Sequence, residues 1–475
     1  MDDSCLLALD CGTSSLRAVL LDSRGRVLDY SERILRLSRP GAGRVEQQPE
    51  LMLRLAHDAI DEVLAAAPSA PVACGIAVQR SSVVCWDRER LVPLSPVLSW
   101  QDTRAADRLE PHAGCAAEIA RRTGLRLSPH YGASKLAWCL DQLPAVREAA
   151  RAGRLAMGPL AAWLLAGLAK EAPCAVDHAN ASRTLLWNLA TRDWDPTLIE
   201  RFGLPPEALP ACWPIRFPHG RLPSPQWRGG VRIAALTGDQ NAAVFADGPL
   251  PEDVALVNLG TGAFALRTSP APNLDADDGL LRGVADSAAD GASYLVEGTV
   301  NGAGAAFDWA EEYWDLAPVA PRLDALLTRV REPEIVINAV GGLGSPWWRH
   351  DVSTHAAETG PRDPDRLATG LAESILFMLR TNLDLLAAAG PPLRTLRLSG
   401  GLTRSGVLCS RLAALCGLPV EVAADPEATA RGVAYLAAGR PSGWSRAPFR
   451  RIDPVDDPAL QRRYESWLAL MRDLS

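Results

Sequence analysis

The sequence predicts an α/β fold with two related domains and a cleft between them. Its 475 residues are too many for one ordinary core and suit two large domains. Residues 6–22 read as two short apolar strands joined by a tight turn, and residues 256–267 repeat that pattern. We interpret the repetition as an internal duplication, in which each half opens its sheet with the same kind of hairpin.

The first hairpin carries groups that suit phosphate. Gly12 lets the backbone approach a ligand closely, and the Thr13 and Ser14 hydroxyls join the backbone N–H groups in a concave set of donors. Arg17 adds a fixed positive charge. Asp10 would repel phosphate unless a cation lay between them, so its position implies Mg²⁺. The alternative is an ordinary hairpin with a solvated aspartate.

The second hairpin repeats the turn without the carboxylate. Gly260 and Thr261 align with the first Gly-Thr pair, and Asn258 stands where the first copy has aspartate. One Mg²⁺ bound off-centre between two such turns would explain why only one of them carries a carboxylate. A pair of these turns around a long insert resembles the actin-like (ribonuclease H-like) ATPase fold, which implies nucleotide in the cleft between the domains. Two unrelated Gly-Thr turns are the alternative.

The composition excludes several classes of protein. Apolar residues make up 48% and charged residues 22%, as in ordinary globular domains, and the net charge of −7 argues against nonspecific nucleic-acid binding. No basic region opens the sequence, and the apolar helix-like run at 155–169 is too short to span a bilayer. We therefore expect a cytoplasmic protein with no membrane partner, whose ten scattered cysteines are buried free thiols.

Several polar and aromatic side chains suit a polyhydroxylated ligand. Arg80 follows a predicted strand, where it either binds a ligand or forms a surface ion pair. Trp100 can pack on C–H faces while Asp102 holds a pair of hydroxyls, although Asp102 also suits a helix cap. His130 and Tyr131 either reach the substrate or are half-buried loop residues, and the sequence favours neither.

A carboxylate for catalysis follows another predicted strand. Phosphoryl transfer from ATP needs a carboxylate at the acceptor hydroxyl and electrostatic cover for the phosphates. Asp239, after the strand at 231–236, suits the first role, and the two hairpins with Mg²⁺ suit the second. Gly401 follows the strand at 396–399 and leaves room for a flat ring, so we expect adenosine there.

These residues lie in motifs that resemble the FGGY carbohydrate kinase family along nearly the whole chain. The motifs occur in family order and are DCGTSSLR, GIAVQR, WQDTR, SKLAW, GDQNAA, NLGTGAF, EGTVNGAGAAFDW, LSGGLTRS and EATARGVAYLA. Within the family, the pattern is most similar to glycerol kinases, through WQD, NASRT and GLGSPWW. The resemblance implies an N-terminal domain at 1–246, a C-terminal nucleotide-binding domain at 247–440 and an extension at 441–475.

The resemblance also implies an activity and a role for each site residue. The activity is ATP-dependent phosphorylation of a hydroxyl of a small polyol or sugar, with a homodimer as one allowed assembly. Pentulose kinase and a non-catalytic nucleotide switch are the alternatives. The implied roles are Mg²⁺ binding for Asp10, phosphate binding for Gly12, Thr13, Ser14, Arg17, Gly260 and Thr261, adenosine binding for Gly401 and Ser405, catalysis for Asp239, and acceptor binding for Arg80, Asp102, Asp239 and Gln240.

The sequence departs from the glycerol enzymes at the acceptor site. Ser81 follows Arg80 where those enzymes carry a glutamate, and His130 stands in place of a tyrosine, with Tyr131 adjacent. Serine is shorter and neutral, so it leaves space and removes an acceptor charge. Because sites built for a particular hydroxyl discriminate sharply, we expect a pocket altered for another polyol.

Overall fold

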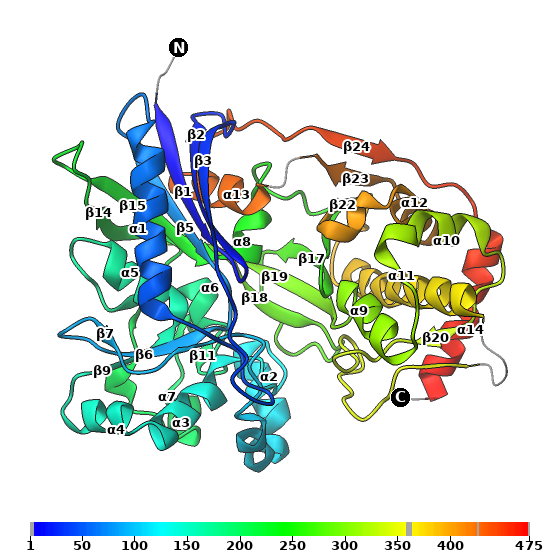
Figure 1. The fold of residues 1–475 in the computed structure, drawn as a ribbon, viewed down its shortest axis with the longest axis horizontal. Coiled ribbons are helices and arrows are strands. Elements are labelled where there is room, and N and C mark those ends of the chain that lie inside the picture. Colours follow the sequence, from blue (N-terminus) through cyan, green and yellow to red (C-terminus); the bar gives the residue numbers. More distant parts are fainter. Residues whose placement is uncertain (1–3, 358–362, 425–426, 474–475) are drawn as a thin grey trace.

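The chain folds into two lobes that lie side by side (Figure 1). The computed structural model describes residues 4–357, 363–424 and 427–473. The first lobe is built on a sheet of β1 (Cys5–Cys11), β2 (Ser15–Asp22), β3 (Val27–Ile34), β5 (Ala73–Val78), β14 (Arg216–Leu222) and β15 (Val231–Gly238). The second is built on β16 (Val254–Leu259), β17 (Ala263–Ser269), β18 (Leu281–Ala288), β19 (Gly291–Val300), β22 (Thr395–Ser399), β23 (Val420–Ala423) and β24 (Phe449–Ile452).

The two sheets have the same strand order, as an internal duplication requires. The first runs β3-β2-β1-β5-β15-β14, and the second runs β19-β17-β16-β22-β23-β24 with β18 added outside β19. Corresponding neighbours also share their directions, since β1 is antiparallel to β2 and parallel to β5, and β16 is antiparallel to β17 and parallel to β22. The two predicted Gly-Thr turns therefore connect equivalent strands of the two sheets.

Helices pack on both sheets, and one of them changes lobe. On the first sheet α1 (Pro49–Ala65) contacts β2 and β3, while α13 (Ala428–Ala437) returns from the second half of the chain to β1, β5 and α8 (Asp239–Ala243). The return depends on close backbone contact, because a Cβ at Gly432 would lie only 1.7 Å from the carbonyl oxygen of Ala242. In the second lobe α10 (Leu323–Arg329), α11 (Pro364–Ala388) and α12 (Gly406–Cys416) contact one another, and α11 also covers β17 and β19.

The last residues of the chain are an integral part of the second lobe. Strand β24 pairs with β23, and α14 (Pro458–Asp473) packs on α11. Leu460 and Trp467 are fully buried there. The segment predicted as an appended extension thus completes the sheet and the core.

A smaller sheet and several helices extend the first lobe. Strand β6 (Val83–Asp87) pairs with β7 (Val92–Pro93), β8 (Val97–Leu98) and β9 (Leu155–Pro159), and β4 (Glu46–Gln47) pairs with β8. Around them lie α2 (Ala116–Thr123), α3 (Gly132–Gln142), α4 (Pro144–Arg151), α5 (Leu160–Leu168), α6 (His178–Ala181) and α7 (Pro196–Arg201). The helical interpretation of the apolar run at 155–169 is wrong for its first residues, because pairing with β6 makes them a strand.

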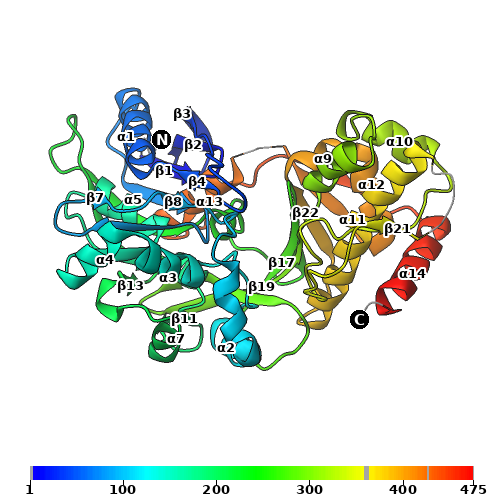
Figure 2. The same cartoon turned by 60° about the horizontal axis from the view of Figure 1, so that its bottom comes forward.

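The hairpin of β18 and β19 carries second-lobe residues to the first lobe. In Figure 1 it crosses between the two lobes, and Figure 2 shows it from below. Asn241 donates its side-chain amide to the carbonyl oxygen of Val284 at 2.5 Å, and Arg216 forms an ion pair with Asp286 at 2.9 Å. A site at the end of the first sheet can therefore receive side chains from both lobes.

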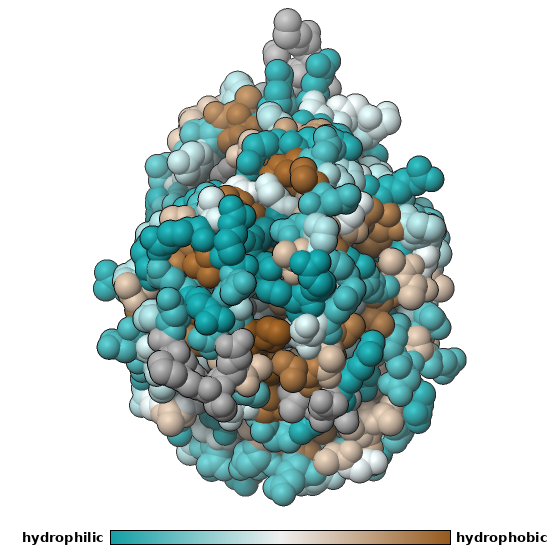
Figure 3. Space-filling model, turned by 90° about the vertical axis from the view of Figure 1, so that its right-hand side faces the viewer, coloured by the Kyte–Doolittle hydropathy of each residue, from teal (hydrophilic) through white to brown (hydrophobic). Residues whose placement is uncertain are grey.

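The cysteines are only partly as predicted. All ten cysteines are free thiols, six of them buried and four half-buried. Over the described ranges, no helix has both the length and the apolar character that crossing a membrane demands. The end of the second lobe presents mainly hydrophilic side chains, with hydrophobic ones in small groups among them (Figure 3).

Candidate active site

Two acidic residues lie at one edge of the first sheet. Asp10 is near the end of β1 and Asp239 directly follows β15, and both strands run parallel to β5, which lies between them. Burial, and then the charge of Asp239, raise the pKa of Asp10 to about 7. Burial also raises the pKa of Asp239, although Arg80 and the backbone N–H of Gln240 oppose the rise.

This pair of carboxylates is suited to Mg²⁺. No group of three acidic, histidine or cysteine ligands occurs among the residues that the structure describes. Mg²⁺ is commonly held by one or two carboxylates together with water and substrate phosphates, so a fuller cage is not required. A divalent cation would relieve the repulsion that raises the pKa of Asp10.

Amide side chains of the first lobe hydrogen-bond to the backbone of the first Gly-Thr turn. Gln79 donates to the Gly12 carbonyl at 3.2 Å, and Gln47 donates to the Thr13 carbonyl at 2.9 Å. The indole N–H of Trp100 donates to the Thr13 hydroxyl oxygen at 3.0 Å. A residue predicted to bind phosphate is therefore bonded directly to one predicted to bind the acceptor.

Arg17, the positively charged residue of the first hairpin, already has acidic partners. Arg17 forms ion pairs with Glu32 at 2.9 Å and with Glu427 at 3.3 Å, and its side chain is 30% exposed. Glu427 immediately precedes α13. A phosphate at this position would share Arg17 with these two carboxylates.

The second Gly-Thr turn lies against the start of α9 (Gly304–Tyr313). The N–H of Gly304 donates to the Gly260 carbonyl at 2.9 Å, and the N–H of Ala305 donates to the Thr261 carbonyl at 3.0 Å. Gly400 has a φ of 96°, and a Cβ there would lie 2.5 Å from the carbonyl oxygen of Leu259. The glycines before α12 are thus adjacent to the second turn.

Ser405 has structural partners that the sequence did not predict. Its hydroxyl oxygen caps α12 by accepting from the N–H of Leu408 at 3.0 Å, and the same hydroxyl bonds to Asp324. The hydroxyl is committed to the helix, so adenosine binding by Ser405 stays a prediction that its own contacts do not favour.

Arg80 belongs to a buried group of charges that joins the lobes. It contacts Glu297 of β19 at 3.5 Å and donates to the amide oxygen of Asn241 at 3.3 Å. Arg183 contacts the same Glu297 oxygen at 2.6 Å. The alternative of a surface ion pair is wrong, because all three charged side chains are at most 8% exposed.

Glu297 and Arg183 were missed by the reasoning on individual residues. Both occur in motifs that carry the family resemblance, EGTVNG and NASRT, and these motifs were the available signal. Burial alone would raise the pKa of Glu297, but Arg183 and Arg80 hold it at about 2. The glutamate is therefore ionised and compensates both guanidinium groups.

Three aromatic side chains lie together on the acceptor side. The ring centres of Trp100 and His130 are 5.5 Å apart, and those of His130 and Tyr131 are 5.1 Å apart. Burial, followed by the charges of Lys135 and Arg183, lowers the pKa of His130 to about 3. His130 is thus a neutral imidazole near pH 7.

The placement of Asp102 favours the alternative in which the residue has a structural role as a cap. The residue is fully buried, its carboxylate accepts the N–H of Val45 at 2.7 Å, and Arg104 binds both carboxylate oxygens. It also caps the turn by accepting from the backbone N–H of Arg104 at 3.1 Å. Binding of substrate hydroxyls by Asp102 stays a prediction that its own contacts do not favour, because Val45 and Arg104 use its acceptor atoms inside the first lobe.

Two buried polar atoms on the acceptor side lack a partner among the described residues. They are the Ser81 hydroxyl and the Gln240 amide oxygen. Ser81 is 3% exposed and has a φ of 64°, which non-glycine residues rarely adopt. These residues follow Arg80 and Asp239 directly, and a Cβ at Gly238 would lie 2.7 Å from the Arg80 side chain. Buried polar groups normally have partners, so both atoms are available to a ligand.

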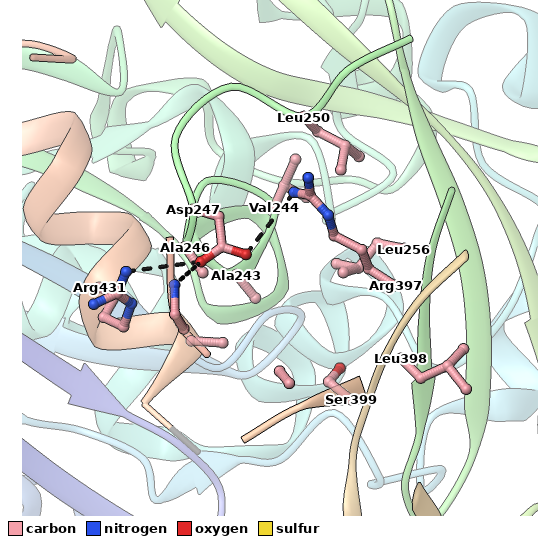
Figure 4. A pocket seen from close by; sticks show the side chains of 13 residues that line it. Ala243, Val244, Ala246, Asp247, Leu250, Leu256, Arg397, Leu398, Ser399 and Arg431 are labelled. Atoms are coloured by element: carbon pink, nitrogen blue, oxygen red, sulfur yellow. Dashed lines mark hydrogen bonds and ion pairs between the residues drawn. The ribbon is translucent and has the colours of Figure 1, made fainter. Parts of the chain in front are cut away.

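A cavity elsewhere contains none of the predicted site residues. It lies where α8 and α13 meet β16 and β22 (Figure 4). There Asp247 lies 3.7 Å from Arg431 and 3.9 Å from Arg397, and accepts the N–H of Ala447 at 2.8 Å. This cavity is at the junction of the lobes, and Ser399 in its lining accepts a hydrogen bond from Asn258 of the second hairpin at 3.1 Å.

Comparisons with known sequences show the family of the chain. Models of the N-terminal and C-terminal domains of the FGGY family of carbohydrate kinases match residues 5–246 and 255–439. A glycerol kinase from Acidovorax ebreus is 33% identical over 452 residues, which cover 92% of this chain and 90% of the relative. A glycerol kinase from Aromatoleum aromaticum is 34% identical over 474 residues, with 95% of each chain covered.

Solved structures confirm the predicted fold. Plasmodium falciparum glycerol kinase with ADP superposes with a TM-score of 0.86 at 22% identity, covering 99% of this chain and 98% of its own. Xylulose kinase from Rhodospirillum rubrum gives a TM-score of 0.84 at 22% identity, covering 99% of both chains. Enzymes named for different acceptors thus share this architecture.

Proposed function

Since the chain belongs to the FGGY family of carbohydrate kinases, we propose that it phosphorylates a small polyol or sugar bound between Arg80 and Asp239. Kinases of this family use ATP and an alcohol group as acceptor. The observation that carries the proposed site is the pair of buried, unpartnered polar atoms on Ser81 and Gln240. They flank the charged residues that the reaction needs.

Asp239 is the proposed base for the acceptor hydroxyl. One of its oxygens accepts the Gln240 N–H at 2.7 Å, and in the described part of the chain the other has no hydrogen-bond partner. The hydrogen bond from Gln240 fixes the orientation of the carboxylate, and the other oxygen can accept a proton from the acceptor hydroxyl. A buried carboxylate with a raised pKa holds that proton better than a solvated one.

The nucleotide is proposed to lie across both Gly-Thr turns. Backbone donors of the turns and Arg17 would contact the phosphates, and the glycines before α12 would receive the adenosine. When bound at Asp10, Mg²⁺ would neutralise phosphate charge and the charge of the neighbouring carboxylates. The proposed nucleotide and metal residues are Asp10, Gly12, Thr13, Ser14, Arg17, Gly260, Thr261 and Gly401.

The acceptor is proposed to be a polyol other than glycerol. The curated relatives are glycerol kinases, but Ser81 and His130 replace residues that the glycerol pattern implies. Serine supplies a neutral donor and acceptor where a glutamate would supply only acceptors. The smaller, uncharged side chain of Ser81 leaves room for an acceptor with one more carbon and its hydroxyl. A cytoplasmic location and a homodimer stay predictions.

The test is ADP release from MgATP with a panel of glycerol, tetritols, pentitols, pentuloses and sugar acids. We expect one longer polyol to exceed glycerol in kcat/KM. A preference for xylulose or ribulose would replace this proposal with the pentulose kinase. Equal or better turnover of glycerol would contradict the proposed effect of Ser81, and no acceptor-dependent ADP release would refute the proposed function.

A further inference from the structure

A lysine that the proposed reaction does not use lies behind the acceptor site. Lys135 is in the first turn of α3 and is fully buried. Its ammonium donates to the carbonyl oxygens of His130 at 2.7 Å, Ser99 at 2.9 Å and Ser81 at 3.2 Å. A protonated lysine has three N–H donors, so each has a carbonyl partner.

The charge of Lys135 is costly where it lies. No carboxylate pairs with it at salt-bridge distance in the ranges the structure describes, and the nearby Asp102 is bound to Arg104. Burial lowers the pKa of Lys135 to about 7, while Asp102 raises it and Arg104 lowers it. Burying an ammonium costs free energy that carbonyl dipoles offset only in part, so an apolar residue would hold this core at lower cost.

The three carbonyls belong to three separate segments of the acceptor site. Ser81 follows Arg80 and carries one of the unpartnered atoms, and its left-handed backbone places its carbonyl toward the lysine. Ser99 precedes Trp100. His130 contacts the Trp100 ring. One ammonium group therefore ties together three of the segments from which acceptor contacts are proposed, while Asp239 and Gln240 form a further wall that it does not contact.

We propose that Lys135 is a positioning residue that sets the spacing of these walls and so the affinity for the acceptor. The inference rests on the proposed acceptor site. Because the lysine contacts only backbone oxygens, it acts on the acceptor through the residues it holds. The nucleotide turns have further anchors, Gln47 and Gln79 on the first turn and α9 on the second. Trp100 also donates to Thr13, so MgATP binding should depend on Lys135 much less than acceptor binding does.

The test is steady-state kinetics of Lys135→Met with the acceptor that the panel identifies. Displacing a substrate-positioning group by about 1 Å costs roughly 100-fold in rate, so we expect kcat/KM for the acceptor to fall by about 10- to 100-fold. The KM for MgATP should stay within about twofold. Lys170 is the other lysine of the chain and is exposed, so Lys170→Met is the matched control and should behave as the parent.

A second variant covers the case in which methionine prevents folding. Lys135→Gln keeps two N–H donors without the charge, and we expect it to retain MgATP binding and lose less acceptor affinity than methionine. Parental kcat/KM for the acceptor in both variants would overturn the inference. So would equal losses for MgATP and acceptor, or loss of folding in both, since the lysine would then support the whole lobe. Absence of turnover in the parent would instead refute the proposed function, and the inference with it.

Discussion

Replacing Glu297 by glutamine removes the carboxylate that forms ion pairs with two buried guanidinium groups. Glu297 is 3% exposed between Arg80 and Arg183. Its pKa lies at about 2 instead of 4.5, and each unit is worth about 1.4 kcal/mol, so its interactions stabilise the folded state by about 3 kcal/mol. Breaking a buried ion pair by removing one partner typically costs about 3–5 kcal/mol, which agrees.

The measurement is urea unfolding of the parent and Glu297→Gln, followed by tryptophan fluorescence at pH 7. We expect the free energy of unfolding to fall by roughly 3 kcal/mol. The matched control is Asp384→Asn on α11, since Asp384 is 51% exposed and pairs with Arg380 at 2.8 Å. A surface pair of this kind is worth about 0–1 kcal/mol. Equal losses in the two variants would refute the reasoning.

The same contribution has a defined dependence on pH. Because the pKa of Glu297 is lowered on folding, its contribution is complete above the unfolded value of 4.5 and is lost as pH falls toward 2. The difference between parent and Glu297→Gln should therefore shrink by about 1 kcal/mol between pH 6 and pH 3.5. A difference that grows on acidification would contradict the assigned charge state.

Three further variants test the proposed site. Asp239→Asn should lower acceptor-dependent turnover by about 10²- to 10⁴-fold while MgATP still binds, and retained turnover in a coupled ADP assay would exclude Asp239 as the base. Asp10→Asn should raise the melting temperature of the nucleotide-free protein at pH 8. Burial and Asp239 raise the pKa of Asp10 to about 7, so its ionised form destabilises the fold above that pH. The gain in melting temperature should vanish below pH 4, and a gain at both pH values would point to another cause. Ser81→Glu should raise kcat/KM for glycerol relative to the longer polyol by about tenfold, and an unchanged ratio in the substrate panel would show that position 81 does not select the acceptor.

Local pattern was sufficient for the hairpins and the duplication. Apolar runs around Gly12 and Gly260 predicted equivalent turns, and the matching strand orders of the two sheets confirm them. Asp10 and Asp239 were each predicted at the end of a strand, and the structure brings them to one sheet edge because both strands run parallel to β5. In each case the relevant partners are close in sequence or follow from the direction of the chain.

Contacts between distant segments could not be predicted in this way. Asp102 offered acceptor atoms, but whether a ligand or Arg104 occupies them depends on how the loop folds back. Ser405 offered a hydroxyl that Asp324 and α12 use. Glu297, the partner of Arg80, lies 217 positions later in the chain, and no spacing rule relates the two residues.

The duplication also explains why the proposed chemistry belongs to one lobe. The two sheets offer equivalent turns, but the position of Asp10 is occupied in the second by Asn258, whose amide donates to the Ser399 hydroxyl at 3.1 Å. An amide there would avoid a second carboxylate beside the proposed phosphate site, and it ties the turn to the end of β22. Since Asp239 follows β15 of the first sheet, both carboxylates would face the proposed nucleotide from one side. In this proposed arrangement the second lobe would hold the phosphates through neutral donors, and Glu297 would be its charged contribution to the acceptor side.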